Sequence, residues 1–414
     1  MSRPRLLFIT TRFPHPHDRG DRIRAFSQIR EFARIAEVTL LAFADQRIAP
    51  EGMEALRAFC RRIEVVPLPT WRSLLGVAVG LAGTSPLQVA YYRSAAMARA
   101  LEALAAERWD VGFAVMFRMF PYLDRLDCRV RVLDLTDSTA LRYGRAMARA
   151  PLHTRLLYRE ELRRSARYEL SALARVSEGW LVAEPDRAEM LERAPGARLE
   201  VVPNGVVTRW GLAGLEGPKQ AEAIFLGNMT VQHNVDGARY LAEEVWPRVR
   251  ARHASAVLRL VGAHAPSLRR IGRQPGVVLE GFVADLAPLL RRAAVAVAPL
   301  RWASGLQNKV LETMAAGLPN VVTPIVNDAI GARPGVSIAV AETTEDLAAT
   351  IGDLFARPRE ARLIGEAGSA HVRARFSWAR AGERLGELLA GGGDSTPGTG
   401  LAGARDPTRN AHRD

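Results

Sequence analysis

Cysteine and lysine are scarce in this sequence, and long apolar runs are missing. The 414 residues include two cysteines, Cys60 and Cys128, whose spacing matches no metal-binding motif. Two isolated cysteines and no recognisable signal segment lead us to expect a reducing, cytoplasmic setting. The nearest candidate for a membrane span, residues 74–82, is far shorter than the ~20 apolar residues that a transmembrane helix needs. We therefore expect neither a disulfide-rich secreted domain nor a membrane-spanning protein.

The chain carries a large net positive charge. Lysine and arginine together number 57 against 44 acidic residues, which gives a formal net charge of +13, and only Lys219 and Lys309 are lysines. Such a surplus suggests a polyanionic partner: nucleic acid, a phosphate-bearing substrate or the anionic face of a membrane. A GC-rich genome, which enriches arginine, explains the surplus equally well. Because the basic residues are not interleaved with stacking aromatic residues, we predict no nucleic-acid partner.

Alternating strand and helix patterns predict an α/β protein. An apolar strand, a helix and a second strand within residues 5–43 form a β-α-β unit, which implies a parallel sheet. The same alternation resumes at residue 223, after a glycine- and proline-containing linker at 208–221. We predict two Rossmann-like, doubly wound parallel-sheet domains at residues 1–206 and 207–375, a helix at 376–390 and a disordered tail at 391–414.

The stretch at residues 299–324 has the pattern of a ligand-binding loop. A strand at 293–300 leads into a loop with Gly305, and a helix is expected from about Gln307 to a glycine–proline stop at 317–319. The free N–H groups and the dipole at a helix start favour phosphate. Glu312, further along, can accept hydrogen bonds from sugar hydroxyls. The pattern suggests a nucleotide-sugar site, and an ordinary strand–loop–helix unit with a solvated Glu312 is the alternative.

The same residues carry a family resemblance. The spacing G-x-x-x-K-x-x-E-x-M-A-x-G-x-P resembles the donor-binding signature of the group-1 glycosyltransferases (family 4), whose GT-B fold has two Rossmann-like domains facing a cleft. That family usually has a second glutamate eight positions before Glu312, where this chain has Ser304. The variant Gln307-Asn308-Lys309 is similar to sugar transferases of exosortase (PEP-CTERM) exopolysaccharide loci. The matching residues are Gly305, Lys309, Glu312, Met314, Ala315, Gly317 and Pro319.

The resemblance implies a donor site in the second domain and a C-terminal helix that packs back on the first. Lys309 and backbone N–H groups are expected to hold the diphosphate, and the loop at 281–282 to stack on the base. The helix capped by Asn234 is expected to follow the loop at 227–230. The candidate catalytic residues are Glu312 and Lys309, from the resemblance, and Asp137 and Arg118, from their positions after predicted strands. The donor-binding residues implied are Gly227, Asn228, Gly281, Phe282, Gly305, Leu306, Gln307, Asn308 and Glu312.

Polar residues also follow the predicted strands of the first domain, where ligands of open α/β sheets bind. Two carboxylates end the strand at 130–135, and a basic loop follows the first strand. A solvated charge run is the alternative for the loop, and helix N-capping by Asp137 or Ser138 is the alternative for the strand end. His15 and His17 alone do not make a metal site, so we predict no metal. The candidate acceptor residues are Asp18, Gly20, Asp21, Arg22 and Asp134.

Two further segments suggest contact with lipid. Residues 71–90 are apolar with Arg72 and Arg93 at their flanks, and a run of arginines follows one predicted helix. Peripheral contact with an anionic membrane would place the protein at the inner face of the cytoplasmic membrane. Packed helices and a solvated basic face are the alternatives. The arginines are Arg155, Arg159, Arg163, Arg164 and Arg167.

These observations predict a glycosyltransferase that moves a sugar from a nucleotide-diphosphate sugar to a glycan or lipid-linked acceptor. As the resemblance implies, transfer would proceed with retention, without metal, and in exopolysaccharide synthesis. The nucleotide sugar would be a co-substrate, and we predict no cofactor. Two alternatives stay open: a non-catalytic nucleotide-sugar-binding protein, which Ser304 favours, and a GT-B sugar-nucleotide epimerase.

Overall fold

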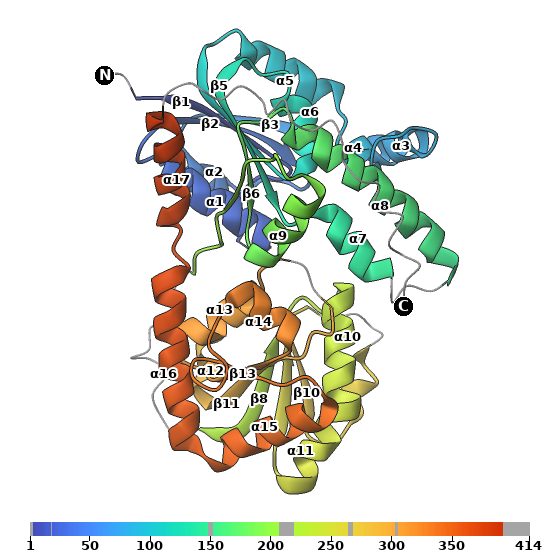
Figure 1. Ribbon diagram of the computed structural model, residues 1–414, viewed down its shortest axis with the longest axis vertical. Helices are drawn as coiled ribbons and strands as arrows, with labels where there is room; N and C mark the ends of the chain where they lie inside the picture. The colour runs from blue at the N-terminus through green and yellow to red at the C-terminus, as the bar shows by residue number, and fades with distance from the viewer. Residues whose placement is uncertain are drawn as a thin grey trace. The chain divides into compact units, whose positions relative to one another are not determined.

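The chain folds into two compact units. The computed structural model describes residues 3–17, 19–147, 152–206, 219–263, 268–302 and 305–391. Unit 1 comprises residues 1–203 together with 378–414, and unit 2 comprises residues 204–377 (Figure 1). None of the described helices combines the length and the apolar character that crossing a bilayer requires.

Unit 1 is built on a parallel sheet. Its described strands have the order β3-β2-β1-β4-β5-β6-β7, and each neighbouring pair is parallel. Apolar side chains point to both faces of β1, which explains its unbroken RLLFIT sequence. The elements are β1 (Arg5–Thr10), α1 (Gly20–Phe32), β2 (Glu37–Ala44), α2 (Pro50–Arg57), β3 (Cys60–Pro67), α3 (Thr70–Leu81), α4 (Leu87–Tyr91), α5 (Ala95–Ala105), β4 (Trp109–Val115), η1 (Phe117–Met119), α6 (Phe120–Leu123), β5 (Cys128–Thr136), α7 (Thr139–Met147), α8 (Leu152–Leu173), β6 (Glu178–Leu181), α9 (Glu184–Arg193), β7 (Leu199–Val201) and α17 (Ala379–Ala390).

The core of unit 1 includes side chains from the end of the chain. The Phe113 ring packs 4.9 Å from the Phe32 ring and 5.1 Å from the Trp180 ring. Ala381 and Leu385 of α17 are buried in the same apolar cluster. Helix α17 therefore completes the first unit, although the whole of unit 2 precedes it in the sequence.

Unit 2 is a second parallel sheet, with the described strands in the order β10-β9-β8-β11-β12-β13. The predicted linker falls mostly on residues 207–218, which lie outside the described residues. The elements are β8 (Gln220–Leu226), α10 (Gln232–Tyr240), the π-helical turn η3 (Leu241–Val245), α11 (Trp246–Arg252), β9 (Val257–Val261), η5 (Ile271–Arg273), β10 (Val277–Gly281), α12 (Ala287–Arg292), β11 (Ala293–Ala298), α13 (Asn308–Ala315), β12 (Asn320–Val322), α14 (Pro324–Ile330), β13 (Ala339–Val340), α15 (Thr344–Ala356) and α16 (Pro358–Arg375).

Both sheets reverse their direction of winding at one place. In unit 1 the reversal falls between β1 and β4, and in unit 2 between β8 and β11. Loops that leave the carboxyl ends of these two strands diverge to opposite faces, and ligands of doubly wound sheets bind in the crevice between them. The fold thus selects the segments after β1 and β4, and after β8 and β11, as the places to look for a site.

Candidate functional site

The stretch after β11 has the predicted strand–loop–helix form. β11 ends at Ala298 and α13 begins at Asn308, close to the positions expected from the sequence. Gly305 has φ of 62°, a left-handed conformation that favours glycine. At the other end Gly317, with φ of 76°, closes α13 through hydrogen bonds from Gly317 N to Met314 O and from Leu318 N to Thr313 O. Ser304 lies outside the described residues.

Helix α13 presents two different faces. Val310, Leu311 and Met314 are buried. Glu312 and Lys309, one turn apart, are partly exposed. Asn204, at the start of unit 2, donates from Nδ2 to Asn308 Oδ1 at 2.8 Å and so fixes the first residue of the helix. The helix is therefore anchored by its apolar face and by its first residue, while Lys309 and Glu312 remain within reach of a ligand.

Lys309 is held in an unusual environment. Its Nζ donates to Asn234 Oδ1 and lies 5.3 Å from the centre of the Phe225 ring. Burial lowers the pKa of Lys309 to about 7. An anionic ligand beside this lysine would raise its pKa again, because a nearby negative charge favours the protonated form. Lys309 is also one of only two lysines in a chain that otherwise uses arginine for its cations.

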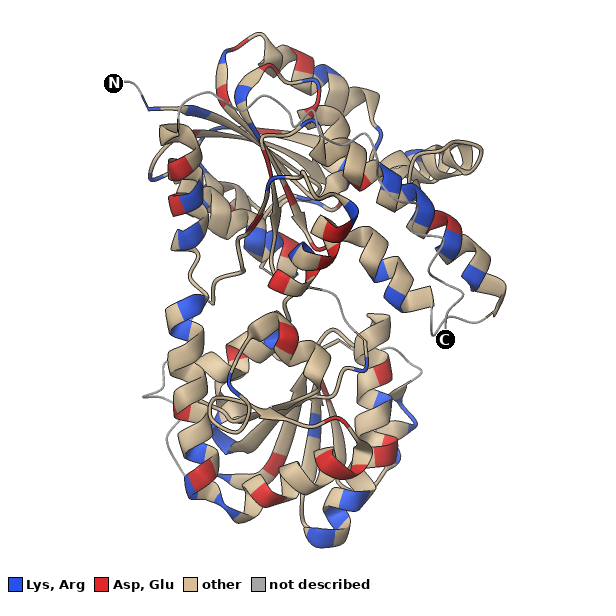
Figure 2. Ribbon diagram, viewed as in Figure 1, with Lys and Arg blue, Asp and Glu red and all other residues tan. Residues whose placement is uncertain are grey.

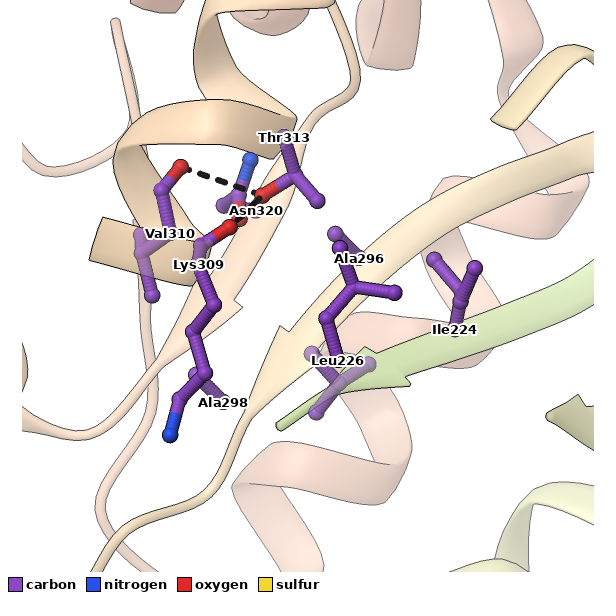
Figure 3. Close-up of a pocket in the computed structure, with 9 residues that line it drawn as sticks. Ile224, Leu226, Ala296, Ala298, Lys309, Val310, Thr313 and Asn320 are labelled. Carbon is purple, nitrogen blue, oxygen red and sulfur yellow. Dashed lines mark hydrogen bonds between the residues drawn. The ribbon is translucent and has the colours of Figure 1, made fainter. Parts of the chain in front are cut away.

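Lys309 also lines a small cavity between α13 and the sheet. Figure 3 shows its side chain extending past Ala298, with Thr313 and Asn320 on the far side. Thr313 Oγ1 lies 2.6 Å from Asn320 Oδ1, which ties α13 to the first residue of β12. The cavity of about 10 Å³ is no larger than one water molecule. It is a packing gap, so a ligand of Lys309 would lie on the surface of unit 2 above it.

Asn234 has a role that the sequence did not reveal. We expected it to cap a helix, but α10 begins at Gln232 and Val231 is its N-cap residue. The Asn234 side chain instead donates from Nδ2 to Asn228 O at 2.9 Å and accepts from Lys309. It thereby joins the loop after β8 to the helix after β11, which is the switch point of this sheet. No local pattern marks this role, because Lys309 is 75 positions away.

The loop after β8 is shaped by close backbone contacts. A Cβ atom added to Gly262 would lie 2.0 Å from Gly227 O, so only glycine fits there, and its φ is 130°. Asn228 Oδ1 accepts from Thr230 N at 3.0 Å and forms a tight turn. Gly262 N donates to Gly281 O, and Phe282 beyond it is 76% exposed. The predicted donor-binding loops therefore lie side by side along one edge of this sheet.

In unit 1, the loop after β1 and the start of α1 form an ion-pair network. Arg12 Nη1 lies 2.5 Å from Asp21 Oδ2, and Arg22 is buried and pairs with Asp45 at 2.9 Å. Burial opposes ionisation of Asp21, but Arg12, Arg19 and Arg118 together outweigh it and lower the pKa of Asp21. Gly20 is the first residue of α1, and Asp18 lies outside the described residues. The network is consistent with an acceptor role as well as with a plain structural one.

Arg118 follows β4 on the other side of the switch point of unit 1. Its guanidinium lies 5.1 Å from the centre of the Tyr92 ring and donates to Gln88 Oε1. Burial is the main cause that lowers the pKa of Arg118, although the group remains a cation. Met116 (φ 71°) and Thr136 (φ 67°), at the ends of the neighbouring strands β4 and β5, both have left-handed backbones. Such strain in side-chain-bearing residues concentrates at functional sites.

The structure corrects the prediction for Asp134. We expected this carboxylate in an acceptor cleft, but it is completely buried. Arg24 binds it through two nitrogens, at 2.7 Å and 3.0 Å, and Gln28 Nε2 and Thr136 N donate to the same oxygens. Because helices cover both faces of this sheet, a carboxylate at the end of a strand can be buried on either face. Asp134 has no oxygen left for an acceptor hydroxyl and serves as a core ion pair.

Asp137, at the same strand end, is partly buried. Its carboxylate is 3.8 Å from Arg142. The helix start is capped by Ser138, whose Oγ accepts from Leu141 N, and by the buried Glu169, which accepts from Thr139 N at 2.6 Å. Desolvation raises the pKa of Glu169 to about 7. Ser138, the other residue of the capping alternative, therefore caps this helix together with Glu169.

No metal centre is evident in the described part of the chain. There, no group of three or more histidine, cysteine or acidic side chains gathers closely enough to hold an ion. His15 and His17 lie with their rings 5.4 Å apart, and the His17 ring packs on Phe26.

Comparisons with known proteins found one family model and several similar solved structures. Residues 220–357 match the family model described as glycosyl transferases group 1. The sequence matches none of the curated proteins. It is similar to the solved structure of Anabaena Alr3699/HepE in complex with UDP, with 13% identity and a TM-score of 0.61 over 94% of this chain and 100% of that chain.

Two further solved structures are similar. For sucrose-phosphate synthase of Thermosynechococcus elongatus the identity is 15% and the TM-score 0.65, over 94% of this chain and 98% of that chain. For WaaG, a glycosyltransferase involved in lipopolysaccharide biosynthesis, the values are 16% and 0.60, over 94% of this chain and 100% of that chain.

The prediction of two doubly wound parallel-sheet domains is confirmed. Together the two sheets and these similarities define the GT-B fold. The family match covers the stretch with Lys309 and Glu312.

Proposed function

We propose that the protein is a retaining hexosyltransferase that uses a nucleotide-diphosphate sugar as donor and a glycan or lipid-linked molecule as acceptor. The observation that carries the proposal is the position of Lys309 at the switch point of unit 2, where its Nζ donates to Asn234 Oδ1 and Asn234 in turn holds the loop after β8. The UDP complex of HepE and the family match over residues 220–357 support the donor class.

Each donor-site residue then has a defined task. When the bond between sugar and phosphate breaks, negative charge develops on the leaving diphosphate, and Lys309 with the N–H groups of Asn308 and its neighbours stabilises it. Glu312, on the same helix, accepts hydrogen bonds from hydroxyls of the donor. Phe282 stacks on the base, and the loop with Gly227 and Asn228 contributes backbone N–H groups. The remaining donor contacts are assigned to Gly281, Gly305, Leu306 and Gln307.

On this proposal the positive charge at the diphosphate comes from the protein, without metal or another cofactor. Unit 1 binds the acceptor. Arg118 and Asp137 are its candidate catalytic residues, and the acceptor-binding residues are Gly20, Asp21 and Arg22. Asp137 is the candidate that receives or orients the acceptor hydroxyl. We place the reaction in exopolysaccharide synthesis at the cytoplasmic face of the membrane, on the resemblance of the Gln307-Asn308-Lys309 segment.

The role of Lys309 predicts that donor binding depends on pH. Above pH 7 the free enzyme holds Lys309 largely neutral, whereas a bound diphosphate favours the charged form. Binding must therefore take up a proton, and affinity falls by up to about tenfold for each pH unit above 7. Calorimetry in buffers of different ionisation heat measures this uptake. A nucleotide sugar is the suitable probe, because its diphosphate has no terminal phosphate that titrates near pH 6.

The chain offers a matched control for this experiment. Lys219, the other lysine, directly precedes β8, at the strand end that is remote from the proposed site. Its Nζ donates to Leu290 O. We expect Lys309→Met to abolish the proton uptake and to weaken donor binding about 10- to 100-fold, while Lys219→Met binds as the wild type does. A thermal-shift screen of nucleotide sugars identifies the base first. Equal binding by wild type and Lys309→Met would remove Lys309 from the diphosphate site.

A further inference from the structure

Helix α3 exposes its large apolar side chains and packs two of its glycines against α4. Trp71, Leu74, Leu75 and Val79 are 58% to 78% exposed. Their spacing of three and four positions places them on one side of the helix. Gly76 and Gly80 lie on the side that packs against α4, where an added Cβ would come within 2.6 Å and 2.7 Å of Ala90 atoms. A helix of a soluble domain normally has the reverse arrangement, so this apolar face fits a partner outside the chain.

Helix α8 continues the apolar surface and adds positive charge. Leu152 and Leu156, one turn apart, are 78% and 77% exposed. Arg155, Arg159 and Arg163 are exposed on the same helix, again at intervals of four. Figure 2 shows several blue segments along α8, together with some red, next to the mostly tan α3. Basic side chains thus stand beside exposed leucines.

The two helices are fastened to one another. Arg164 of α8 donates to Gly80 O at 2.9 Å and to Leu81 O at 3.1 Å, at the end of α3. The Glu161 carboxylate accepts from Leu87 N at 3.0 Å, at the start of α4. Figure 1 shows α3, α4 and α8 together on one side of unit 1. The apolar segment at residues 71–90 and the arginine-bearing helix α8, which were separate predictions from the sequence, therefore form one surface.

We propose that this surface docks on a bilayer that contains anionic lipid. We call it the lipid-docking surface: Trp71, Leu74, Leu75, Val79, Leu152 and Leu156 enter the boundary between headgroups and acyl chains, and Arg155, Arg159 and Arg163 contact anionic headgroups. Apolar side chains flanked by arginine are the composition that binds such an interface. A second copy of this chain fits less well, because it would bring like charges together. The inference does not depend on glycosyl transfer, since it concerns binding alone.

The test is flotation of the purified full chain with vesicles. We expect binding to vesicles of mixed neutral and anionic phospholipid and much weaker binding to purely neutral vesicles. Leu74→Glu combined with Val79→Glu should abolish binding, since both positions are exposed and neither change disturbs the core. Leu363→Glu is the matched control, because Leu363 is a 60% exposed leucine on α16 of unit 2. Its binding should equal that of the wild type.

A second variant tests the charge. Replacing the three arginines Arg155, Arg159 and Arg163 by glutamine should reduce binding to anionic vesicles roughly a hundredfold, because each basic residue near such a surface contributes about fivefold. Removal of three exposed arginines from α16 (Arg359, Arg362 and Arg373) should change it far less. Donor binding by thermal shift should be the same in all variants, which separates this inference from the proposed function.

Several outcomes would overturn the inference. One is a wild-type protein that does not float with anionic vesicles. Another is a Leu74→Glu/Val79→Glu variant that floats like the wild type. A third is light scattering that shows a wild-type dimer, a monomeric Leu74→Glu/Val79→Glu variant and no vesicle binding, which would assign the surface to a second copy of the chain.

Discussion

Replacement of Glu312 by alanine is expected to reduce sugar transfer about 10²- to 10³-fold and to leave the fold intact. Glu312 is partly exposed on α13, so truncation should change the free energy of unfolding by no more than about 1 kcal/mol. If the carboxylate positions the donor sugar, its loss removes contacts that are strongest in the transition state. Initial rates at saturating donor concentration give kcat, and the ratio of the wild-type kcat to the variant kcat measures the loss.

Two further variants sharpen this experiment. Glu312→Gln keeps an acceptor oxygen but loses the charge, so it should retain more activity than Glu312→Ala if hydrogen bonding alone matters. Glu345→Ala, on α15 of the same unit, removes an exposed carboxylate that pairs with Arg248 and should have no effect on transfer. Glu312→Ala with wild-type kcat and donor KM would remove Glu312 from the active site.

Replacement of Asp134 by alanine is expected to destabilise unit 1 by about 3–5 kcal/mol. The change leaves the Arg24 guanidinium buried without its bidentate partner, and breaking a buried ion pair from one side has a cost of this size. Gln28 Nε2 and Thr136 N lose an acceptor as well. Many single domains have a total stability of only about 5–15 kcal/mol, so a large fall in the urea midpoint is expected.

Paired substitutions show whether the ion pair is responsible. The double variant Arg24→Met/Asp134→Leu removes both charges and should be more stable than Asp134→Ala, because no charge is left unpaired. Asp124→Ala breaks an exposed pair with Arg175 and should cost about 0–1 kcal/mol. If Asp134→Ala unfolds at the same urea concentration as Asp124→Ala, the assignment of Asp134 to the core ion pair is wrong.

The sequence alone predicted the features that depend on residues close to one another along the chain. The alternation of strands and helices predicted two parallel sheets, because apolar period and turn residues are local signals. The donor stretch was predicted for the same reason: its glycine loop, helix and stop all lie within residues 305–319, and the structure forms α13 within one residue of the expected start. The residue types there, Lys309 and Glu312, indicated the chemistry.

The tertiary structure alone decided which polar groups are available and what they contact. Asp134 and Arg24 are 110 positions apart, and Lys309 and Asn234 are 75 apart, so no local pattern links either pair. Asp134 and Asp137 look alike as strand-end carboxylates, yet one is in the core because helices cover both faces of the sheet. The apolar composition of α3 fits an interior helix equally well. Only the packing of Gly76 and Gly80 against α4 turns its leucines outward, since burial depends on the whole fold.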